Sequence, residues 1–270
     1  MSILQPIRRL VFSIGRRVRF FLVNRKSPMF RATRIRDWIW ILRGFNVESI
    51  WLLGLNQKAP KEEYLADINK KRISRVTNIG FSQVLNNKVE FQYFFEKIFE
   101  LPKLCGVIVN GKTYPGKPGE QPLNTMDALE RYGRLVLKPV FGGMGKGILF
   151  VDRYGGSITV NGDPKGEREL LEMVSGLHQY MICERIQQNQ FLSDIYPHTV
   201  NSLRVITCLD SNTGEVFIPF AIQRFGTDIS APTDNFSQRG VSAPLDIDSG
   251  RMGAVVMKGP NWERLTLSSH

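Results

Sequence analysis

A cluster of glycines between two short apolar runs constrains the fold of this chain more than any other feature. The apolar runs cover residues 135–137 and 148–151. Glycine lets the backbone adopt positive φ and approach a ligand closely, and successive exposed N–H groups in such a turn form a concave anion site. The pattern predicts two antiparallel strands joined by a phosphate-binding loop, with an ordinary glycine-rich hairpin as the alternative. The glycines and the lysines around them are Lys138, Gly142, Gly143, Gly145, Lys146 and Gly147.

The order of residues in this turn excludes two common phosphate motifs. A P-loop needs a lysine followed by serine or threonine at the start of a helix, whereas Lys146 is followed by Gly147 and a β-rich run. A dinucleotide fingerprint needs three glycines in the spacing Gly-x-Gly-x-x-Gly, and the third is missing after Gly145. The sequence therefore favours a loop between strands.

Charge is concentrated at the N-terminal end of the 270-residue chain. Residues 1–45 contain eleven basic side chains and one acidic side chain, Asp37, which is a local net charge of +10 out of a total of +11. The remainder is close to neutral, so the basic composition is weak evidence for nucleic-acid binding by the main domain. We therefore expect no nucleic-acid partner.

Arginines alternate with apolar residues over residues 1–30. No apolar run there reaches the roughly 18 residues of a membrane span, and a basic amphipathic helix on an anionic membrane fits the pattern. A targeting peptide and a basic helix packed on the body are the alternatives. Three tryptophans within residues 37–55 predict a buried or interfacial helix. We expect a basic, aromatic helical arm over residues 1–60 and a separate domain over residues 61–270.

The cysteines and histidines indicate neither a zinc site nor a catalytic triad. Cys105, Cys183 and Cys208 lie in apolar runs, which predicts buried free thiols in a reducing compartment. Apolar periodicity and turn residues predict the remaining elements. Helices are expected over residues 61–76, 84–101, 126–132 and 167–177, and strands over residues 104–109, 158–160, 180–186, 202–209, 216–224 and 240–247.

Several separate motifs agree in order and spacing with one known superfamily. They are Asn87-Lys88, Leu137-Lys138-Pro139 before the glycines, residues 181–186 (MICERI), residues 197–205 (PHTVNSLRV), residues 221–226 (AIQRFG) and residues 234–237 (DNFS). The series resembles the ATP-grasp superfamily and is most similar to the sugar-transfer associated ATP-grasp family, from about residue 88 to about residue 256. The resemblance implies an α+β fold in which two β-rich subdomains with flanking helices clasp a nucleotide. It implies ATP and Mg²⁺ as cofactors.

The resemblance also implies roles for nucleotide-binding residues. Lys88 and Lys138 would reach the phosphates, and the glycine loop with Lys146 would cover the β- and γ-phosphates. Glu184 would meet adenine or ribose, while the backbones of Arg185 and Ile186 would face adenine. For Lys88 the alternative is an exposed helix lysine, and for Glu184 it is a strand-end carboxylate paired with a lysine.

Further roles concern the reaction and its acceptor. Arg204 and Arg224 are the expected catalytic residues, because a guanidinium fork binds two oxygens of a phosphoryl group. Asn201, Asp234 and Asn235 are the expected substrate contacts, although an Asx turn explains the last two equally well. Asn201 and Arg204 are three residues apart in an expected strand and would point to opposite faces.

The implied activity is ligation of a carboxylate to an amine through an acyl phosphate, in the biosynthesis of cell-surface polysaccharide. The expected partners are small, sugar-linked carboxylates and amines and an anionic membrane surface; the expected location is the cytoplasm or the inner face of the membrane. Two departures weaken the case for catalysis: the family's last strands with their magnesium-binding carboxylates are not found, and Arg239 stands where a glycine is usual. The metal ligands therefore stay unassigned. A truncated, non-catalytic partner protein at the membrane is the alternative.

Overall fold

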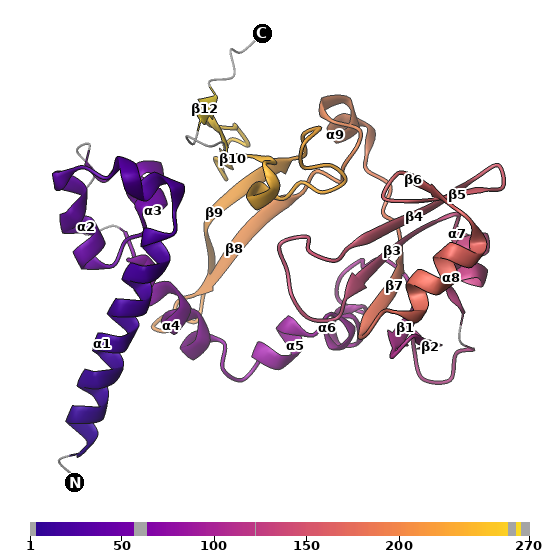
Figure 1. Ribbon diagram of the computed structural model, residues 1–270, viewed down its shortest axis with the longest axis horizontal. Coiled ribbons are helices and arrows are strands. Elements are labelled where there is room, and N and C mark those ends of the chain that lie inside the picture. The colour runs from indigo at the N-terminus through magenta and orange to yellow at the C-terminus, as the bar shows by residue number, and fades with distance from the viewer. Residues whose placement is uncertain (1–3, 57–63, 122, 259–262, 266–270) are drawn as a thin grey trace. The chain divides into compact units, whose positions relative to one another are not determined.

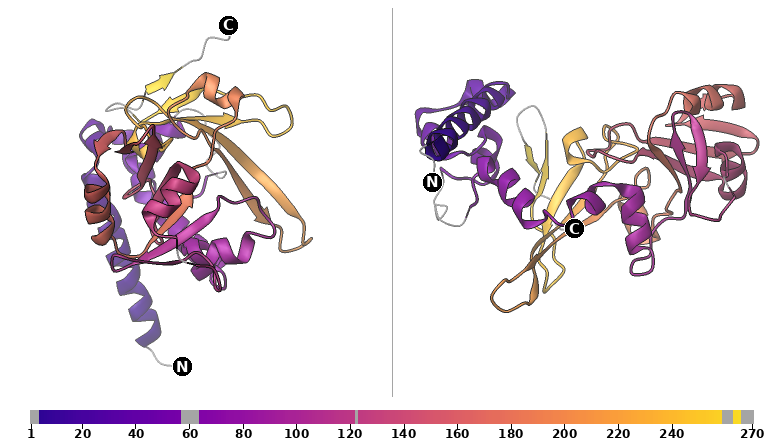
Figure 2. Two further views of the ribbon diagram at one scale, coloured as in Figure 1. Left: turned by 90° about the vertical axis from the view of Figure 1, so that its right-hand side faces the viewer. Right: turned by 90° about the horizontal axis from the view of Figure 1, so that it is seen from below.

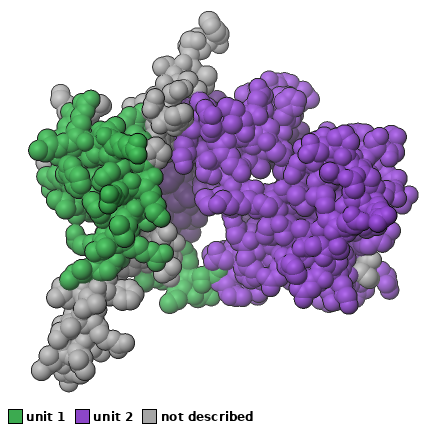
Figure 3. All heavy atoms as spheres, viewed as in Figure 1, with its two compact units in different colours: residues 1–82, 260–262 green, residues 83–259, 263–270 purple. Residues whose placement is uncertain are grey.

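The computed structural model describes residues 4–56, 64–121, 123–258 and 263–265. The chain divides into two compact units, which are coloured separately in Figure 3. Unit 1 consists of residues 1–82 and 260–262, and unit 2 consists of residues 83–259 and 263–270. Helices form the described part of unit 1, and antiparallel sheets with flanking helices form most of unit 2 (Figure 1). The expected α+β class is confirmed.

Unit 1 packs short helices around a small aromatic core. Residues 37–55 form two helices rather than one, because Gly44 has a φ of 97° and ends the first of them. The core consists of Trp40, Ile41, Phe45, Val47, Ile50 and Leu55. No described helix is long and apolar enough to cross a membrane. The elements are α1 (Leu4–Arg25), η1 (Pro28–Ala32), η2 (Ile35–Asp37), α2 (Trp38–Arg43), α3 (Val47–Leu52) and α4 (Asp67–Thr77).

The first sheet of unit 2 has seven described strands in the order β2-β1-β7-β3-β4-β5-β6, all antiparallel to their neighbours. The expected helix over residues 84–101 is interrupted, because Asn87 caps a new helix by accepting hydrogen bonds from the N–H groups of Val89 and Glu90. The strands are β1 (Leu104–Val109), β2 (Lys112–Pro115), β3 (Arg134–Pro139), β4 (Leu149–Tyr154), β5 (Ser157–Val160), β6 (Asp163–Lys165) and β7 (Tyr180–Glu184). The helices are α5 (Ser82–Asn86), α6 (Lys88–Phe95), α7 (Thr125–Tyr132) and α8 (Glu167–Ser175).

The two faces of this sheet have different neighbours. Leu135, Leu137, Val151 and Ile182 point into a core that also contains Ala128 and Leu129 of α7 and Leu170 and Val174 of α8. Because side chains alternate along a strand, the residues between them point to the opposite face. We call this opposite face the Lys138 face; it carries Arg134, Val136, Lys138, Phe150, Asp152, Met181 and Cys183.

The second sheet has the order β12-β11-β10-β9-β8 among the described residues. The far end of the β8–β9 hairpin, residues 209–216, projects away from the rest of the sheet (Figures 1 and 2). Helix α9 was not anticipated from the sequence. The elements are α9 (Gln190–Ile195), β8 (Leu203–Leu209), β9 (Val216–Phe225), η3 (Phe236–Gln238), β10 (Val241–Leu245), β11 (Val255–Met257) and β12 (Glu263–Leu265).

The three cysteines are free thiols, and two of them are buried as expected. Burial, with smaller contributions from Cys183 and Glu184, raises the pKa of Cys105 to about 12, and burial also raises the pKa of Cys183. Since the thiolate is the reactive species, we expect a thiol reagent to label only Cys208 in the native protein and all three thiols after unfolding. Mass spectrometry of labelled peptides would measure this, and rapid native labelling of Cys105 would contradict it.

Candidate functional site

The glycine loop between β3 and β4 has a backbone that side chains would hinder. Gly142, Gly145 and Gly147 have φ values of 102°, 70° and 72°, and Met144 has a φ of 62°. A Cβ on Gly147 would come within 2.8 Å of the Tyr180 Oη. One on Gly142 or Gly143 would meet no atom within 4 Å, so the backbone there has open space beside it. The loop therefore offers an accessible, turned backbone of the kind that binds anions.

The two lysines predicted to reach phosphates lie close together. Lys138 is on the Lys138 face, in register with Met181. Lys88, at the start of α6, donates from its Nζ to the carbonyl oxygens of Pro139, Val140 and Gly142, at 2.9, 3.2 and 2.9 Å. Its ammonium group therefore holds the first part of the glycine loop. It is not the freely exposed helix lysine of the alternative interpretation.

Burial and the nearby charge of Lys138 lower the pKa of Lys88. A polyphosphate bound beside the pair would favour the protonated form and raise this pKa again. We therefore expect ATP binding to take up protons in alkaline buffer, and ATP affinity to fall as pH rises through the lowered pKa.

Calorimetry in two buffers with different ionisation enthalpies would measure the proton uptake. Lys88→Gln is the control, because it removes the titrating group and keeps a donor at that position. Equal proton uptake by the wild type and by this variant would contradict the assignment.

The predicted adenine contacts at the end of β7 are tied to neighbouring strands. Glu184 accepts a hydrogen bond at Oε1 from the backbone N–H of Lys103 at 2.9 Å. Arg185 donates from Nη1 to both oxygens of Asp152, at 2.9 and 2.6 Å, and its guanidinium lies 5.0 Å from the Phe150 ring centre. Ile186 is half exposed just beyond the strand. The Arg185 side chain therefore ties the end of β7 to β4 through Asp152.

The second sheet positions the two predicted catalytic arginines on one face. Arg204 of β8 is in register with Ile222 of β9, so these two side chains point to the same face of the sheet. Arg224 lies two residues after Ile222 on β9 and therefore points to that face as well. Arg224 donates to the Ser202 Oγ, with Nε at 3.1 Å, and lies 3.4 Å from the Asp234 Oδ1. The Ser202 hydroxyl in turn donates to Asp234. Arg224 is therefore held in place, whereas Arg204 is exposed.

The residues predicted to contact the substrate differ in whether their side chains are free to bind a ligand. Asn201 is 3% exposed and precedes β8, so the expectation that it lies in one strand with Arg204 is wrong. Its Nδ2 donates to the carbonyl oxygens of Leu192 and Tyr196, and its Oδ1 accepts from the Thr199 hydroxyl and the Gly226 N–H. These bonds leave its side chain no capacity for a ligand.

Asn235 caps η3 by accepting from the N–H and the hydroxyl of Ser237, both at 3.1 Å. This is the Asx turn of the alternative interpretation. A Cβ built on Gly145 would lie 3.4 Å from the Asn235 Nδ2 and 3.1 Å from the Gln238 Oε1. The segment that follows Asp234 therefore touches the glycine loop, and the Asp234 carboxylate connects that contact to Arg224.

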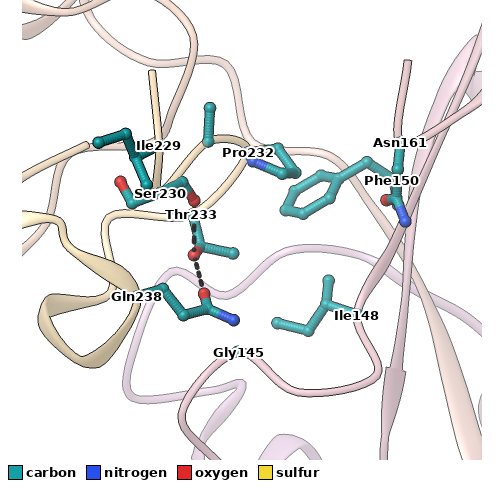
Figure 4. Close-up of a pocket in the computed structure, with 10 residues that line it drawn as sticks. Gly145, Ile148, Phe150, Asn161, Ile229, Ser230, Pro232, Thr233 and Gln238 are labelled. Carbon is teal, nitrogen blue, oxygen red and sulfur yellow. Dashed lines mark hydrogen bonds between the residues drawn. The ribbon is translucent and has the colours of Figure 1, made fainter. Parts of the chain in front are cut away.

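A pocket of about 380 Å³ opens where the glycine loop meets this segment (Figure 4). Phe150 of the Lys138 face points toward Pro232, and Thr233 donates a 2.6 Å hydrogen bond to Gln238. Among the predicted site residues, Gly145 lines this pocket and Lys138 does not. The lining residues are Gly145, Ile148, Phe150, Asn161, Ile229, Ser230, Ala231, Pro232, Thr233 and Gln238.

The structure thus brings together most of the predicted residues, with contacts that the sequence did not reveal. Lys88, Lys138 and the glycine loop form one group, and Arg204, Arg224 and Asp234 form another. Phe150, Asp152 and Ser202 were missed; the first two share the face of Lys138 through the register of β4 against β3. In the described ranges, no three or more His, Cys, Asp or Glu side chains gather as a metal site would require.

Comparison with known proteins identifies the family. The model of the sugar-transfer associated ATP-grasp family matches residues 67–267. No curated protein and no solved structure matches the chain. Members of this family generally bind ATP with Mg²⁺, in keeping with an accessible glycine loop beside two lysines. Because the match spans most of its length, this chain belongs to the sugar-transfer associated ATP-grasp family.

Proposed function

We propose that the chain is an ATP-dependent ligase that joins a carboxylate to an amine during the synthesis of sugar-containing cell-surface polymers. The observation that carries the proposal is the fixed guanidinium of Arg224, which shares a face with Arg204 and is linked through Asp234 to the segment that touches the glycine loop. A phosphate-binding loop and cations that stabilise the transferred charge are the elements that phosphoryl transfer requires.

The proposed reaction has two steps. An oxygen of the substrate carboxylate attacks the γ-phosphorus of ATP, the bond from that phosphorus to the bridging oxygen breaks, and ADP leaves with the electron pair. An amine nitrogen then attacks the acyl carbon, the carbon–oxygen bond to the phosphate breaks, and inorganic phosphate leaves. The nitrogen loses its proton to solvent.

The residues of this chain would act by position and charge. The open backbone at Gly142 and Gly143 would receive phosphate oxygens, with Lys138 neutralising them, and the backbone near Ile186 would face the adenine. Arg224 and Arg204 would stabilise the charge on the phosphoryl group in transit. Ser202 and Asp234 would keep the Arg224 fork oriented, because the Ser202 hydroxyl oxygen accepts from its Nε and Nη2 and the Asp234 carboxylate forms an ion pair with its Nη2.

Magnesium would neutralise phosphate charge when it is bound with ATP. The described residues do not offer the gathered carboxylates that would hold it, so we derive no step through the metal and assign no residue to it. Residues 61–270 would form the domain with ligase activity, and residues 1–60 would form a separate arm. Dependence on ATP is consistent with a reaction in the cytoplasm.

We expect Arg224→Met to lower turnover at least about a hundredfold with little change in ATP affinity, because Arg224 would act on charge that develops during transfer. The assay would follow ADP release from ATP in the presence of paired carboxylates and amines, and hydroxylamine would trap the acyl phosphate as a hydroxamate. Arg224→Lys should recover part of the rate. Arg168→Met, at an exposed arginine of α8, is the matched control.

Two results would reject the ligase. One is ADP release that does not depend on any added carboxylate. The other is tight ATP binding without turnover for any substrate pair, which would favour a nucleotide-binding partner protein with no catalytic role.

A further inference from the structure

Helix α1 of unit 1 carries an exposed apolar stripe. Ile14, Val18 and Leu22 are 54%, 53% and 50% exposed. Because 3.6 residues make one helical turn, side chains spaced by four lie within about 80° of one another around the axis. Arg17 and Arg19 are each one residue from Val18 and therefore flank the stripe, about 100° to either side. Both of these arginines are exposed.

The flank of α1 that adjoins the stripe on the Arg17 side is attached to the rest of unit 1, since Phe21 and Asn24 lie about 60° and about 120° from Val18 around the helix axis. Asn24 is 2% exposed and accepts at Oδ1 from the backbone N–H of Val47 at 2.9 Å. Phe21 packs against Phe30 and Trp38, with ring centres 5.9 and 6.1 Å apart. These contacts fix the orientation of the helix within unit 1 through one flank and leave Ile14, Val18 and Leu22 exposed beside it.

Apolar exposure continues from the stripe onto the neighbouring short helices. Trp38 lies against Phe21, which is next to Leu22, and Trp38 itself is 38% exposed. Ile39 and Leu42 of α2 and Ile35 of η2 are also exposed. A tryptophan at the edge of an apolar surface is typical of a membrane–water interface, where its ring is apolar and its N–H is polar.

Basic side chains without acidic partners surround this surface, although Arg17 donates to the Leu42 carbonyl oxygen at 3.2 Å and Arg43 lies over the Trp40 ring. In the described part of residues 13–45, none of the basic side chains forms an ion pair. A cluster of cations that form no ion pair attracts an extended anionic surface, and each Lys or Arg near anionic lipid contributes about 1 kcal/mol. The exposed basic residues are Arg17, Arg19, Arg25, Lys26, Arg31, Arg34, Arg36 and Arg43.

We propose that unit 1 binds an anionic lipid surface, with α1 lying parallel to the membrane plane and its Ile14, Val18 and Leu22 stripe inserted among the headgroups. The basic side chains favour an anionic surface over a neutral one, and the exposed aliphatic stripe favours a lipid surface over a polar one. A polynucleotide would use the same arginines but would gain nothing from exposed aliphatic side chains. A second copy of the chain would bring like charges together, since the same basic residues would face each other.

The test is co-sedimentation of the full chain with vesicles of phosphatidylcholine alone and of phosphatidylcholine with phosphatidylglycerol. We expect sedimentation only with the anionic vesicles, and a blue shift of tryptophan fluorescence that Trp38→Phe abolishes. Ile14→Ser, Val18→Ser and Leu22→Ser combined should lower the partition coefficient about a hundredfold, given the apolar area removed. Arg19→Gln, Arg25→Gln and Lys26→Gln combined should lower it to a similar extent at low salt.

Leu171→Ser is the matched control, because Leu171 is a similarly exposed leucine on α8 of unit 2; it should leave vesicle binding unchanged. Circular dichroism before and after substitution checks that the helices persist. Undiminished sedimentation of the triple serine variant would overturn the proposal, as would binding of the wild type to duplex DNA but not to vesicles. Lipid-free dimerisation that the serine variant abolishes would overturn it in favour of a second copy.

Discussion

Lys138→Met is expected to weaken ATP binding about a hundredfold and to leave the fold intact. Lys138 lies on the face of the first sheet opposite the main core, in register with Met181, so the substitution leaves that core unchanged. A charge-assisted hydrogen bond contributes about 1.5–3 kcal/mol, and about 1.4 kcal/mol corresponds to a tenfold change in affinity. Methionine keeps most of the aliphatic stem, so the substitution tests the charge. Calorimetric titration with ATP would measure the effect.

The matched control is Lys165→Met at the far edge of the same sheet, where the lysine pairs with Glu169. It should bind ATP like the wild type. Unchanged affinity in Lys138→Met would refute the assignment of the Lys138 face to the nucleotide, whereas equal losses in both variants would indicate a general effect of net charge.

The second large effect is expected for stability. Asn201→Ala should lower the free energy of unfolding by about 3–5 kcal/mol, because it removes one buried amide with four partners, two of them in buried residues, and leaves several of them without hydrogen bonds, at about 1–3 kcal/mol each. Urea denaturation followed by circular dichroism would measure this difference.

Asn212→Ala, in the exposed turn between β8 and β9, is the control and should change the unfolding free energy little. The Asn201 experiment also separates two roles. A variant with wild-type stability and a raised KM for the acceptor would favour the substrate contact that the family resemblance implies, and would count against the structural role.

The glycine loop and its lysines could be placed from the sequence because their signals are local. Four glycines within six residues, between two apolar runs, leave few backbone conformations other than a turn between strands. Strand β1 has the bounds that its apolar run predicts.

Contacts between distant segments could not be placed in this way. The pairing of Arg224 with Asp234 depends on the register of β8, β9 and β10 and on the path of the segment after Phe225. Asn201 was misjudged for a related reason. Alternation was applied to it as if it lay in a strand, but β8 begins at Leu203 and the amide is instead enclosed by the loop around α9.

The short elements α9, β11 and β12 escaped prediction because three to six residues give no period that can be recognised. The prediction of one helix over residues 37–55 was wrong because it was too long. Its tryptophans indicated burial correctly for Trp40, yet the pattern did not reveal that Gly44 would divide it.

The two-sidedness of the first sheet has a consequence for how this protein can change over time. On β3, Leu135 and Leu137 support the core, while Val136 and Lys138 lie on the opposite face, which we propose binds the nucleotide. Adjacent positions of β3 are therefore under different selection: one is constrained by folding, and the next by ligand binding. A complete substitution scan of β3, β4 and β7 should give two interleaved series: odd positions of β3 would be intolerant in any folding screen, and even positions only in a screen that requires the ligand.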